Sequence, residues 1–328
     1  MLNPKLKLNK NLFDKDTEKK ATRDGFGQAI MILGEKNKKV VVLSADLAES
    51  CKVDGFLEKY PKRFIECGVA EQNMAAIAAG LSVSGKIPFI TSFAAFSPGK
   101  NWETIRTTIV YNNANVKIAG HHAGIVTGAD GATHQATEDI SSVRAWPGLN
   151  IFIPCDSIEA RKITLKAAEI NGPVYLRFSR EKTPIITTDE TPFLEGIQLF
   201  WEEEKPKTTI LATGHMVYQA LLAAKELKKQ NINVLVANVS ILKPIDRKSL
   251  IEFAKKTKSI VTCEDHQVTG GLGGIVSEVL AQNHPTPIEF IGLKDTFAES
   301  GEVKDLLKKY QMDSSAIINA VKKVIRRV

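Results

Sequence analysis

The sequence predicts an α/β protein of two consecutive domains, each a mostly parallel sheet covered by helices. At 328 residues the chain is long enough to bury two separate cores. Short apolar runs alternate with helical patterns up to about residue 178, and a second alternation begins near residue 208. Between them, Pro184, Pro192 and Pro206 interrupt the pattern. We therefore place an N-terminal extension at 1–20, a first domain at 21–188, a linker at 189–206 and a second domain at 207–328.

The first domain follows this alternation from a charged N-terminal arm, residues 1–20, which we expect to be extended and solvated. Asp24 is expected to cap a helix that ends near residue 35, because Phe26, Ile30 and Leu33 then share one face. Buried strands are expected at 40–43, 87–91, 116–119, 150–154 and 174–178, and helices at 70–81, 98–111 and 157–170. Alternation of this kind implies a parallel sheet covered on both faces.

The second domain repeats the pattern without repeating the residues. Its expected strands are 208–212, 233–236, 259–262 and 287–291, and its expected helices are 215–229, 247–256, 271–282, 303–310 and 314–326. A glycine run at 270–274 opens one helix. The run has neither the lysine of a phosphate-binding loop nor the spacing of a dinucleotide-binding turn. Close packing is therefore the interpretation that we prefer for it.

Composition excludes several functional classes. Apolar residues make up 43% of the chain and charged residues 25%, as in ordinary globular proteins. The net charge of +7 lies largely at the two ends and has no interleaved aromatic residues, which argues against nucleic-acid binding. No apolar run approaches membrane-spanning length, and no signal peptide is recognisable. The four cysteines are widely separated, which fits a reducing, cytoplasmic setting.

The stretch 64–74 carries the first candidate for chemistry, Glu71. An apolar lead-in ends at Gly68, and a helix rich in small residues begins near Ala70. Glu71 then lies in the first turn, where the helix dipole favours a carboxylate. Its mostly apolar neighbours would penalise that charge and suit the group to exchanging a proton. The alternative is a solvated glutamate, which is common in first turns.

A second candidate is the long loop at 120–139. It carries His121, His122, Asp130 and His134 among several glycines. Loops that follow strands are where α/β proteins place their functional residues. Taken alone, a histidine such as His122 is more often structural, but its distance in sequence to Asp130 and His134 favours a site.

Three stretches together resemble the transketolase family of thiamine diphosphate enzymes. They are Gly-Val-Ala-Glu-Gln-Asn-Met at 68–74, Gly-Ala-Asp-Gly-Ala-Thr-His-Gln at 128–135 and Leu-Arg-Phe-Ser-Arg at 176–180. Their order and spacing are similar to those of the pyrimidine-binding and C-terminal domains of a transketolase. The resemblance covers residues from about 21 to the end, and it implies ketol transfer between a ketose phosphate and an aldose phosphate.

One family motif is absent from the 328 residues. No Gly-Asp-Gly occurs, although the family uses a Gly-Asp-Gly…Asn motif to hold magnesium and the coenzyme's diphosphate. The resemblance therefore implies the C-terminal subunit of a split transketolase, with thiamine diphosphate shared with a separate N-terminal subunit and Mg²⁺ bound by that subunit. An α2β2 assembly is expected. We find no residues for a metal site in this chain.

The resemblance also implies roles for residues around the coenzyme. Glu71 resembles the catalytic glutamate that hydrogen-bonds the aminopyrimidine ring nitrogen. Phe93 and Phe96 fall where the family stacks aromatic rings on the pyrimidine, although core packing is nearly as good an account of Phe93. The family's third aromatic position corresponds to Gly99. Asp46 resembles an aspartate near the coenzyme at the subunit interface.

Further residues resemble the family's substrate site. A phosphate-binding group is implied for Arg23, Ser50, His122 and Arg180, since arginine offers a rigid fork of donors. Asp130 resembles the residue that reads a substrate hydroxyl, and His134 a catalytic residue that contacts the donor's oxygens. No family role falls on His121. The histidines of the second domain, His215, His266 and His284, are expected to be structural.

Three alternatives remain open at this point. A deoxyxylulose-phosphate synthase shares the Asp-Gly-x-Thr-His-Gln run, but the continuation at 136–140 is more similar to transketolase. A 2-oxo acid dehydrogenase β subunit would not be expected to carry that run or the two arginines. A catalytically silent paralogue that binds a partner need not have kept Glu71, Asp130 and His134.

Overall fold

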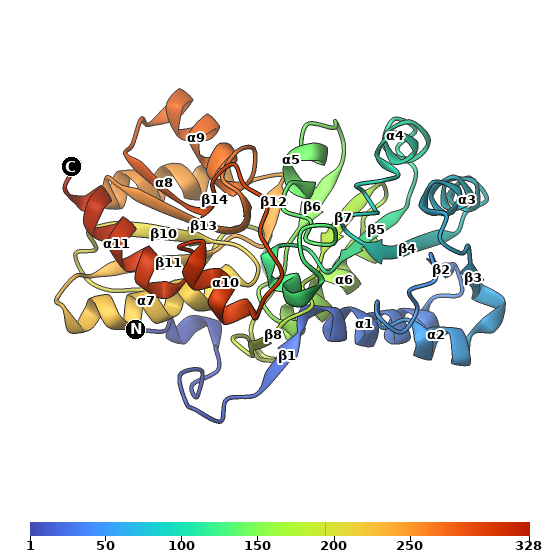
Figure 1. The fold of residues 1–328 in the computed structure, drawn as a ribbon, viewed down its shortest axis with the longest axis horizontal. Coiled ribbons are helices and arrows are strands. Elements are labelled where there is room, and N and C mark those ends of the chain that lie inside the picture. The colour runs from blue at the N-terminus through green and yellow to red at the C-terminus, as the bar shows by residue number, and fades with distance from the viewer. Residues whose placement is uncertain (194) are drawn as a thin grey trace.

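The apolar runs of the first domain assemble into one sheet. The computed structural model describes residues 1–193 and 195–328, and it orders this sheet β12-β6-β7-β5-β4-β2-β3 (Figure 1). The strands are β2 (Val40–Ser44), β3 (Phe64–Glu66), β4 (Ile87–Phe93), β5 (Lys117–His121), β6 (Asn150–Phe152), β7 (Val174–Arg177) and β12 (Ile241–Lys243). Every pairing from β3 to β6 is parallel. Their carboxyl ends therefore meet at one edge of the sheet, where the loops gather.

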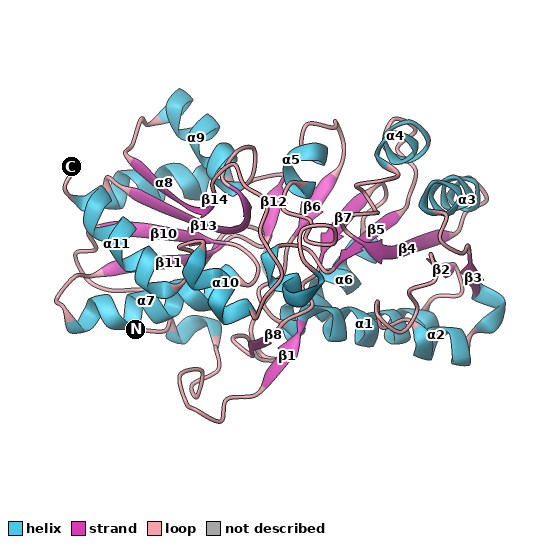
Figure 2. Ribbon diagram, in the orientation of Figure 1, coloured by secondary structure: helices cyan, strands magenta, loops and turns pink. Residues whose placement is uncertain are grey.

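Helices cover both faces of this sheet, as Figure 2 shows. They are α1 (Thr22–Lys36), α2 (Asp54–Lys59), α3 (Glu71–Val83), α4 (Trp102–Thr104), α5 (Asp139–Val143) and α6 (Ser157–Glu169), with a π-helix, η3 (Ile105–Val110), after α4. Side chains alternate along β2, so that Val40 and Val42 pack with α1 and α6 on one face. Val41 and Leu43 pack with α3 and η3 on the other.

The second domain forms a sheet ordered β14-β13-β10-β11-β9. Its strands are β9 (Gln198–Trp201), β10 (Thr208–Ala212), β11 (Val234–Asn238), β13 (Ile260–Gln267) and β14 (Ile288–Leu293). Its helices are α7 (Met216–Lys229), α8 (Arg247–Thr257), α9 (Leu272–Asn283), α10 (Val303–Lys309) and α11 (Ser314–Ile325). Only the edge strand β9 runs antiparallel to its neighbour among the described strands of this sheet. The prediction of two mostly parallel sheets covered by helices is confirmed.

Two helix starts differ from expectation. We predicted that Asp24 caps helix α1, but the helix begins at Thr22, so Asp24 is its third residue. The Asp24 carboxylate accepts from the Ala21 N–H at 3.1 Å. The helix expected at 98–111 begins only at Trp102. Before it, the Phe96 carbonyl accepts from the main-chain N–H groups of Lys100 and Asn101, which forms a turn.

The N-terminal arm is not the solvated segment that its charge suggested. Leu6, Leu8 and Leu12 are buried in the core of the second domain. In Figure 1 the N-terminus lies beside α7, and the Asn3 N–H donates to the Phe200 carbonyl of β9 at 2.9 Å. The arm then returns to the first domain, where β1 (Lys19–Ala21) pairs with β8 (Lys182–Pro184). The lysines stay at the surface because the alternation of Lys and Leu turns the apolar side chains inward.

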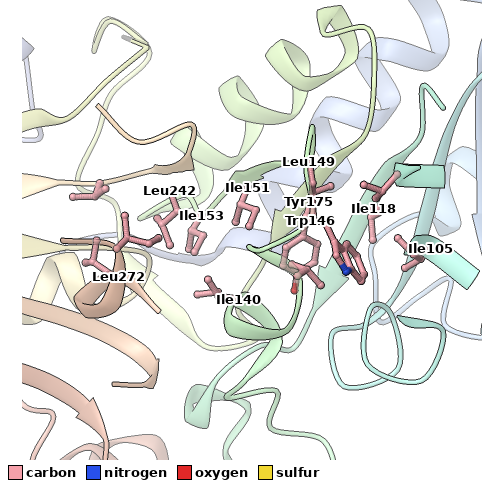
Figure 3. Packing of buried hydrophobic residues seen from close by; sticks show 14 of the residues in the cluster. Ile105, Ile118, Ile140, Trp146, Leu149, Ile151, Ile153, Tyr175, Leu242 and Leu272 are labelled. Carbon is pink, nitrogen blue, oxygen red and sulfur yellow. The ribbon is translucent and has the colours of Figure 1, made fainter. Parts of the chain in front are cut away.

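Other segments also join the two domains. The expected linker contains β9, which belongs to the second sheet, and β12 of the second domain pairs with β6 of the first. Figure 3 shows Leu242 and Leu272 of the second domain packed beside Ile140 and Ile153 of the first, in one continuous core. The domains therefore share buried surface rather than a flexible hinge.

The glycine run at the start of α9 supports the close-packing interpretation. A Cβ on Gly271 would lie 1.8 Å from Glu264 Oε2. The Glu264 carboxylate accepts from the N–H groups of Leu272 and Gly273 at 2.7 and 2.9 Å. A buried protein carboxylate thus takes the place at the helix N-terminus that an anionic ligand would need. Across the described residues, the structure has no helix long and apolar enough to cross a membrane.

Candidate active site

The candidate residues come from several strand ends at the carboxyl edge of the first sheet. Phe93 ends β4, His122 follows β5, and Arg180 lies three residues after β7. From β2 the chain passes to β3 on one side of β2 and then to β4 on the other side. The direction in which strands are added to the sheet therefore reverses between β2 and β4. Such a switch point leaves a crevice beyond the strand ends, where α/β proteins bind ligands.

Glu71 is the first residue of α3, and it is buried. Its side chain is 2% exposed, which rules out the solvated first-turn glutamate. Oε2 accepts from Lys100 Nζ at 2.9 Å, and the Glu71 carbonyl accepts from Asn101 Nδ2 at 3.0 Å. The turn after Phe96 therefore places a cation on this carboxylate. The Lys100 side chain is 45% exposed, so it can turn to solvent if another group takes its place.

Aromatic rings and histidines gather next to that turn. The rings of Phe93 and Phe96 are nearly parallel, with centroids 6.1 Å apart. His134 meets Phe96 edge-on at 5.4 Å, and His122 lies 3.9 Å from Phe93. Phe93 also packs in the core with α1, whereas Phe96 is only partly buried. The cluster offers flat apolar faces with polar ring nitrogens at its border.

Arg23 lies against His122 and brings a positive charge to the ring cluster. Arg23 Nη1 lies 3.4 Å from His122 Nε2 and donates to the Ser50 main-chain carbonyl at 2.9 Å. Ser50 thus takes part through its backbone. Burial, then Arg23, Arg180 and His134, lower the pKa of His122 to about 3. Neutral His122 can accept from Arg23, while its Nδ1 and Arg23 Nε are buried without a partner among the described residues.

Arg180 and Asp130 form an ion pair, and Arg180 is close enough to His122 to help lower its pKa. Arg180 Nη1 donates to Asp130 Oδ1 at 2.8 Å and to the Thr127 carbonyl at 3.2 Å. Both side chains are partly exposed, at 41% and 31%. Asp130 closes the 3-10 helix η4 (Ile125–Asp130), so this ion pair ties β7's end to the loop after β5.

The remaining candidates are less closely linked. Asp46 is exposed at the end of β2, and its main-chain N–H donates to Glu66 at 2.8 Å. His121 packs edge-on against Phe26 at 4.9 Å, in the core. His215 and His266 are buried, with pKa values that burial lowers to about 4. These two are consistent with the structural role that we expected.

Sequence reasoning missed the residues that hold this site together. Lys100 and Asn101 contact Glu71, and Thr127 donates its hydroxyl to the His122 carbonyl at 2.5 Å. No spacing in the sequence indicates that a turn 29 residues later returns to Glu71.

The chain's own residues suit part of a large cofactor. A buried carboxylate, two nearly parallel rings and unpartnered buried nitrogens would hold an aromatic heterocycle and a polar substrate. Within residues 1–193 and 195–328, no group of three or more His, Cys, Asp or Glu side chains could hold a metal ion.

Comparison with known proteins identifies the family. The model of the transketolase pyrimidine-binding domain matches residues 18–185, and that of the transketolase C-terminal domain matches 201–317. The chain is 40% identical over 94% of its length to a putative transketolase C-terminal section from Methanocaldococcus jannaschii, 97% of which is covered. It is 36% identical over 96% of its length to a 6-deoxy-6-sulfo-D-fructose transketolase subunit from Clostridium sp., covering 98% of it.

A solved structure described as a split gene transketolase, inactive beta4 tetramer, agrees with a TM-score of 0.87 and 43% identity. That match covers 93% of this chain and 98% of the other. Human transketolase is 33% identical, but the chain spans only 50% of its length. The chain therefore belongs to the transketolase family, in which it corresponds to the C-terminal section of a split enzyme.

Proposed function

We propose that this chain is the C-terminal subunit of a transketolase that moves a two-carbon ketol unit from a ketose phosphate to an aldose phosphate. The observation that carries the proposal is Glu71, a buried carboxylate at a helix start, which contacts Lys100 and Asn101 in the turn that follows the Phe93–Phe96 ring pair. In the family a glutamate in this motif activates thiamine diphosphate, which supplies the nucleophilic carbon that takes up the two-carbon unit. Magnesium and the diphosphate group would be held by a separate N-terminal subunit.

Each side chain then has a proposed task. Glu71 would exchange its bond to Lys100 for one to the aminopyrimidine ring nitrogen, while Phe93 and Phe96 pack against the ring. Asp46 would approach the coenzyme where the subunits meet. Arg23, Arg180 and His122 would bind the substrate's phosphate, because two guanidinium groups lie close to this histidine. Ser50 would support the phosphate site by holding Arg23 with its main-chain carbonyl. Asp130 would read a hydroxyl, and His134 would contact the donor's oxygens.

The names of relatives give different substrates. One relative's name gives 6-deoxy-6-sulfo-D-fructose, and a relative from Phocaeicola vulgatus, 33% identical, is an apulose-4-phosphate transketolase subunit. Arg23 and Arg180 favour a phosphorylated substrate here. A sulfonated sugar, whose anionic head is similar, is the second candidate that these two arginines support.

The experiment is reconstitution from separate subunits. The purified chain, given thiamine diphosphate, Mg²⁺, xylulose 5-phosphate and ribose 5-phosphate, should show no ketol transfer until the N-terminal subunit is added. Turnover by the lone chain, verified free of the partner, would contradict the split-enzyme proposal.

A second arm tests the role of Glu71. Glu71→Gln should assemble normally but lose about a hundredfold in turnover at saturating coenzyme, since one charged hydrogen bond in a transition state contributes ~3 kcal/mol. Glu252→Gln, the same change at an exposed glutamate on α8 of the second domain, is the matched control and should keep its activity. A Glu71→Gln enzyme within about threefold of wild type would rule out the proposed role.

A further inference from the structure

The loop that carries most of the candidate substrate groups is fastened to the other domain. This site loop, defined as residues 122–137, connects β5 to α5 and contains His122, Asp130 and His134. At its end, the Thr137 carbonyl accepts from the Gln267 N–H of β13 at 2.7 Å. Two residues earlier, Gln135 Nε2 donates to the Glu299 carbonyl at 3.2 Å. Both partners belong to the second domain.

The strongest of these attachments is Asp265 on β13. Oδ1 accepts from the Ile125 N–H at 2.8 Å, and Oδ2 lies 3.4 Å from the Val126 nitrogen. Asp265 is 3% exposed, so this carboxylate has exchanged water for main-chain donors at the start of η4. An N–H···carboxylate bond in such surroundings is stronger than a bond between neutral groups.

The glycines of the site loop show how closely the domains approach. Gly124, Gly128 and Gly131 all have positive φ. A Cβ on Gly124 would lie 1.9 Å from Asp265 Oδ2, and one on Gly131 would lie 2.3 Å from Ser300 Oγ. Only glycine leaves room for those side chains at these two positions. The loop backbone is therefore shaped against the second domain.

The held segment leads directly to the candidate substrate groups. Helix η4 begins at Ile125 and ends at Asp130, which pairs with Arg180. Within it, Thr127 contacts both Arg180 and the His122 carbonyl. A shift at Ile125 and Val126 would therefore move the Arg180–Asp130 pair relative to His122.

We propose that Asp265 of the C-terminal domain is a positioning residue for the substrate pocket, acting through the N–H groups of Ile125 and Val126. This inference rests on the proposed function. It means that the second domain contributes to substrate binding without touching the substrate. The carboxylate fixes the start of η4, and η4 fixes where Asp130 and Arg180 meet.

The neighbouring residue provides a matched control. Glu264 precedes Asp265 on the same strand, is also fully buried, and also accepts from two main-chain N–H groups. Because successive side chains point to opposite faces, Glu264 holds α9 instead of the site loop. Asp265→Asn and Glu264→Gln therefore remove similar carboxylates at different places.

The first measurement is amide hydrogen exchange on the chain alone. Asp265→Asn should speed exchange at 125–130 on the order of tenfold, because a charged acceptor of these amides is lost. Glu264→Gln should leave 125–130 unchanged and speed exchange at 272–273. Exchange at 125–130 in Asp265→Asn equal to that of wild type would overturn the inference. If Asp265→Asn shows no cooperative melting, the measurement is made on Asp265→Ser, whose smaller side chain keeps one oxygen. Exchange at 125–130 equal to that of wild type would again overturn the inference.

The second measurement uses the enzyme assembled with its N-terminal subunit. Asp265→Asn should raise KM for the phosphorylated donor about tenfold while kcat and coenzyme affinity stay within about twofold. A loosened loop with unchanged KM would also overturn the inference. If the wild-type pair transfers no ketol unit, the proposed function fails, and hydrogen exchange alone decides the role of Asp265 in holding the loop.

Discussion

Arg180 joins the site loop through a single nitrogen. Its Nη1 makes both bonds, to Asp130 and to the Thr127 carbonyl, and a guanidinium carries five N–H donors in all. The remaining donors suit a planar or tetrahedral anion bound beside His122. The lowered pKa of His122 means that the positive charge on this side of the pocket comes from Arg23 and Arg180.

Arg180→Ala should therefore raise KM for phosphorylated sugars about ten- to a hundredfold, because a charged hydrogen bond contributes roughly 1.5–3 kcal/mol. Unphosphorylated sugars should show a much smaller change, since they lack the anion. Steady-state kinetics with both kinds of donor measure the difference. Arg247→Ala, an exposed arginine at the start of α8, is the control and should affect neither. Equal losses on both kinds of donor would count against the assignment.

At the residue scale, motif residues were easier to predict than their neighbours. Phe93, Phe96, His122 and His134 do lie together, because each follows a parallel strand and parallel strands end at the same edge. Lys100 was not predicted, since its contact with Glu71 depends on how a turn folds back. Asp265 was not predicted either, because it lies more than a hundred residues from the loop that it holds.

At the element scale, periodicity located the longer helices and strands, but it did not locate short elements such as α2, α5 and β12, nor where the elements end or cross between domains. Apolar period is a local property of the chain, so β4 and α6 could be predicted from their own residues. The pairing of β12 with β6 could not, since a three-residue strand has almost no pattern. The leucines of the N-terminal arm were mistaken for part of a solvated segment because their alternation with lysine hid a buried face.

Glu159, in the first turn of α6, gives a pH-dependent prediction for an element. Oε1 accepts from Asn238 Nδ2 and Oε2 from the Cys155 N–H, and burial raises the pKa of Glu159 to about 7. The folded protein therefore binds more protons than the unfolded chain between about pH 4.5 and 7. The free energy of unfolding should therefore fall as pH rises through this window, and it should fall no further from this cause at higher pH.

Glu159→Gln should remove that penalty. The amide can still accept from Cys155, and it can donate to Asn238 Oδ1, which has no partner among the described residues, once the Asn238 amide turns over. We expect a gain of roughly 1–3 kcal/mol at pH 8 and little change at pH 5. Chemical denaturation at both pH values measures it, with Glu169→Gln, exposed on the same helix, as the control. A loss of stability at pH 8 would show that the charged bonds outweigh the burial.

At the scale of the whole molecule, the two sheets act as one body. The N-terminal leucines and β12 each cross between domains, and the site loop is held by β13. Relative movement of the domains would break buried hydrogen bonds as well as apolar contacts. The site should therefore be shaped before any partner binds, and we propose that the partner adds the other half of the coenzyme site.

We expect the proposed N-terminal subunit to contact the outer face of α3. Ala76, Gly80 and Val83 are exposed at helical spacing, and a Cβ on Gly80 would meet nothing within 4 Å. Val83 is 87% exposed, which is unusual for a branched apolar side chain. Small side chains allow another backbone to approach closely, so this face suits the N-terminal subunit that we propose.

Ala76→Arg should therefore abolish assembly without unfolding the chain. On the free chain the new side chain points into solvent, and the melting temperature should hardly change. At a close interface the arginine would add bulk and bury an unpaired charge, which costs about 3 kcal/mol or more of binding free energy. The Kd for the N-terminal subunit should therefore rise by about a hundredfold or more. Titration calorimetry with the N-terminal subunit measures this, and Ala281→Arg, exposed on α9 of the other domain, is the matched control. If Ala76→Arg binds the subunit as tightly as Ala281→Arg does, α3 is not the interface, and the coenzyme site must be completed from another side of Glu71.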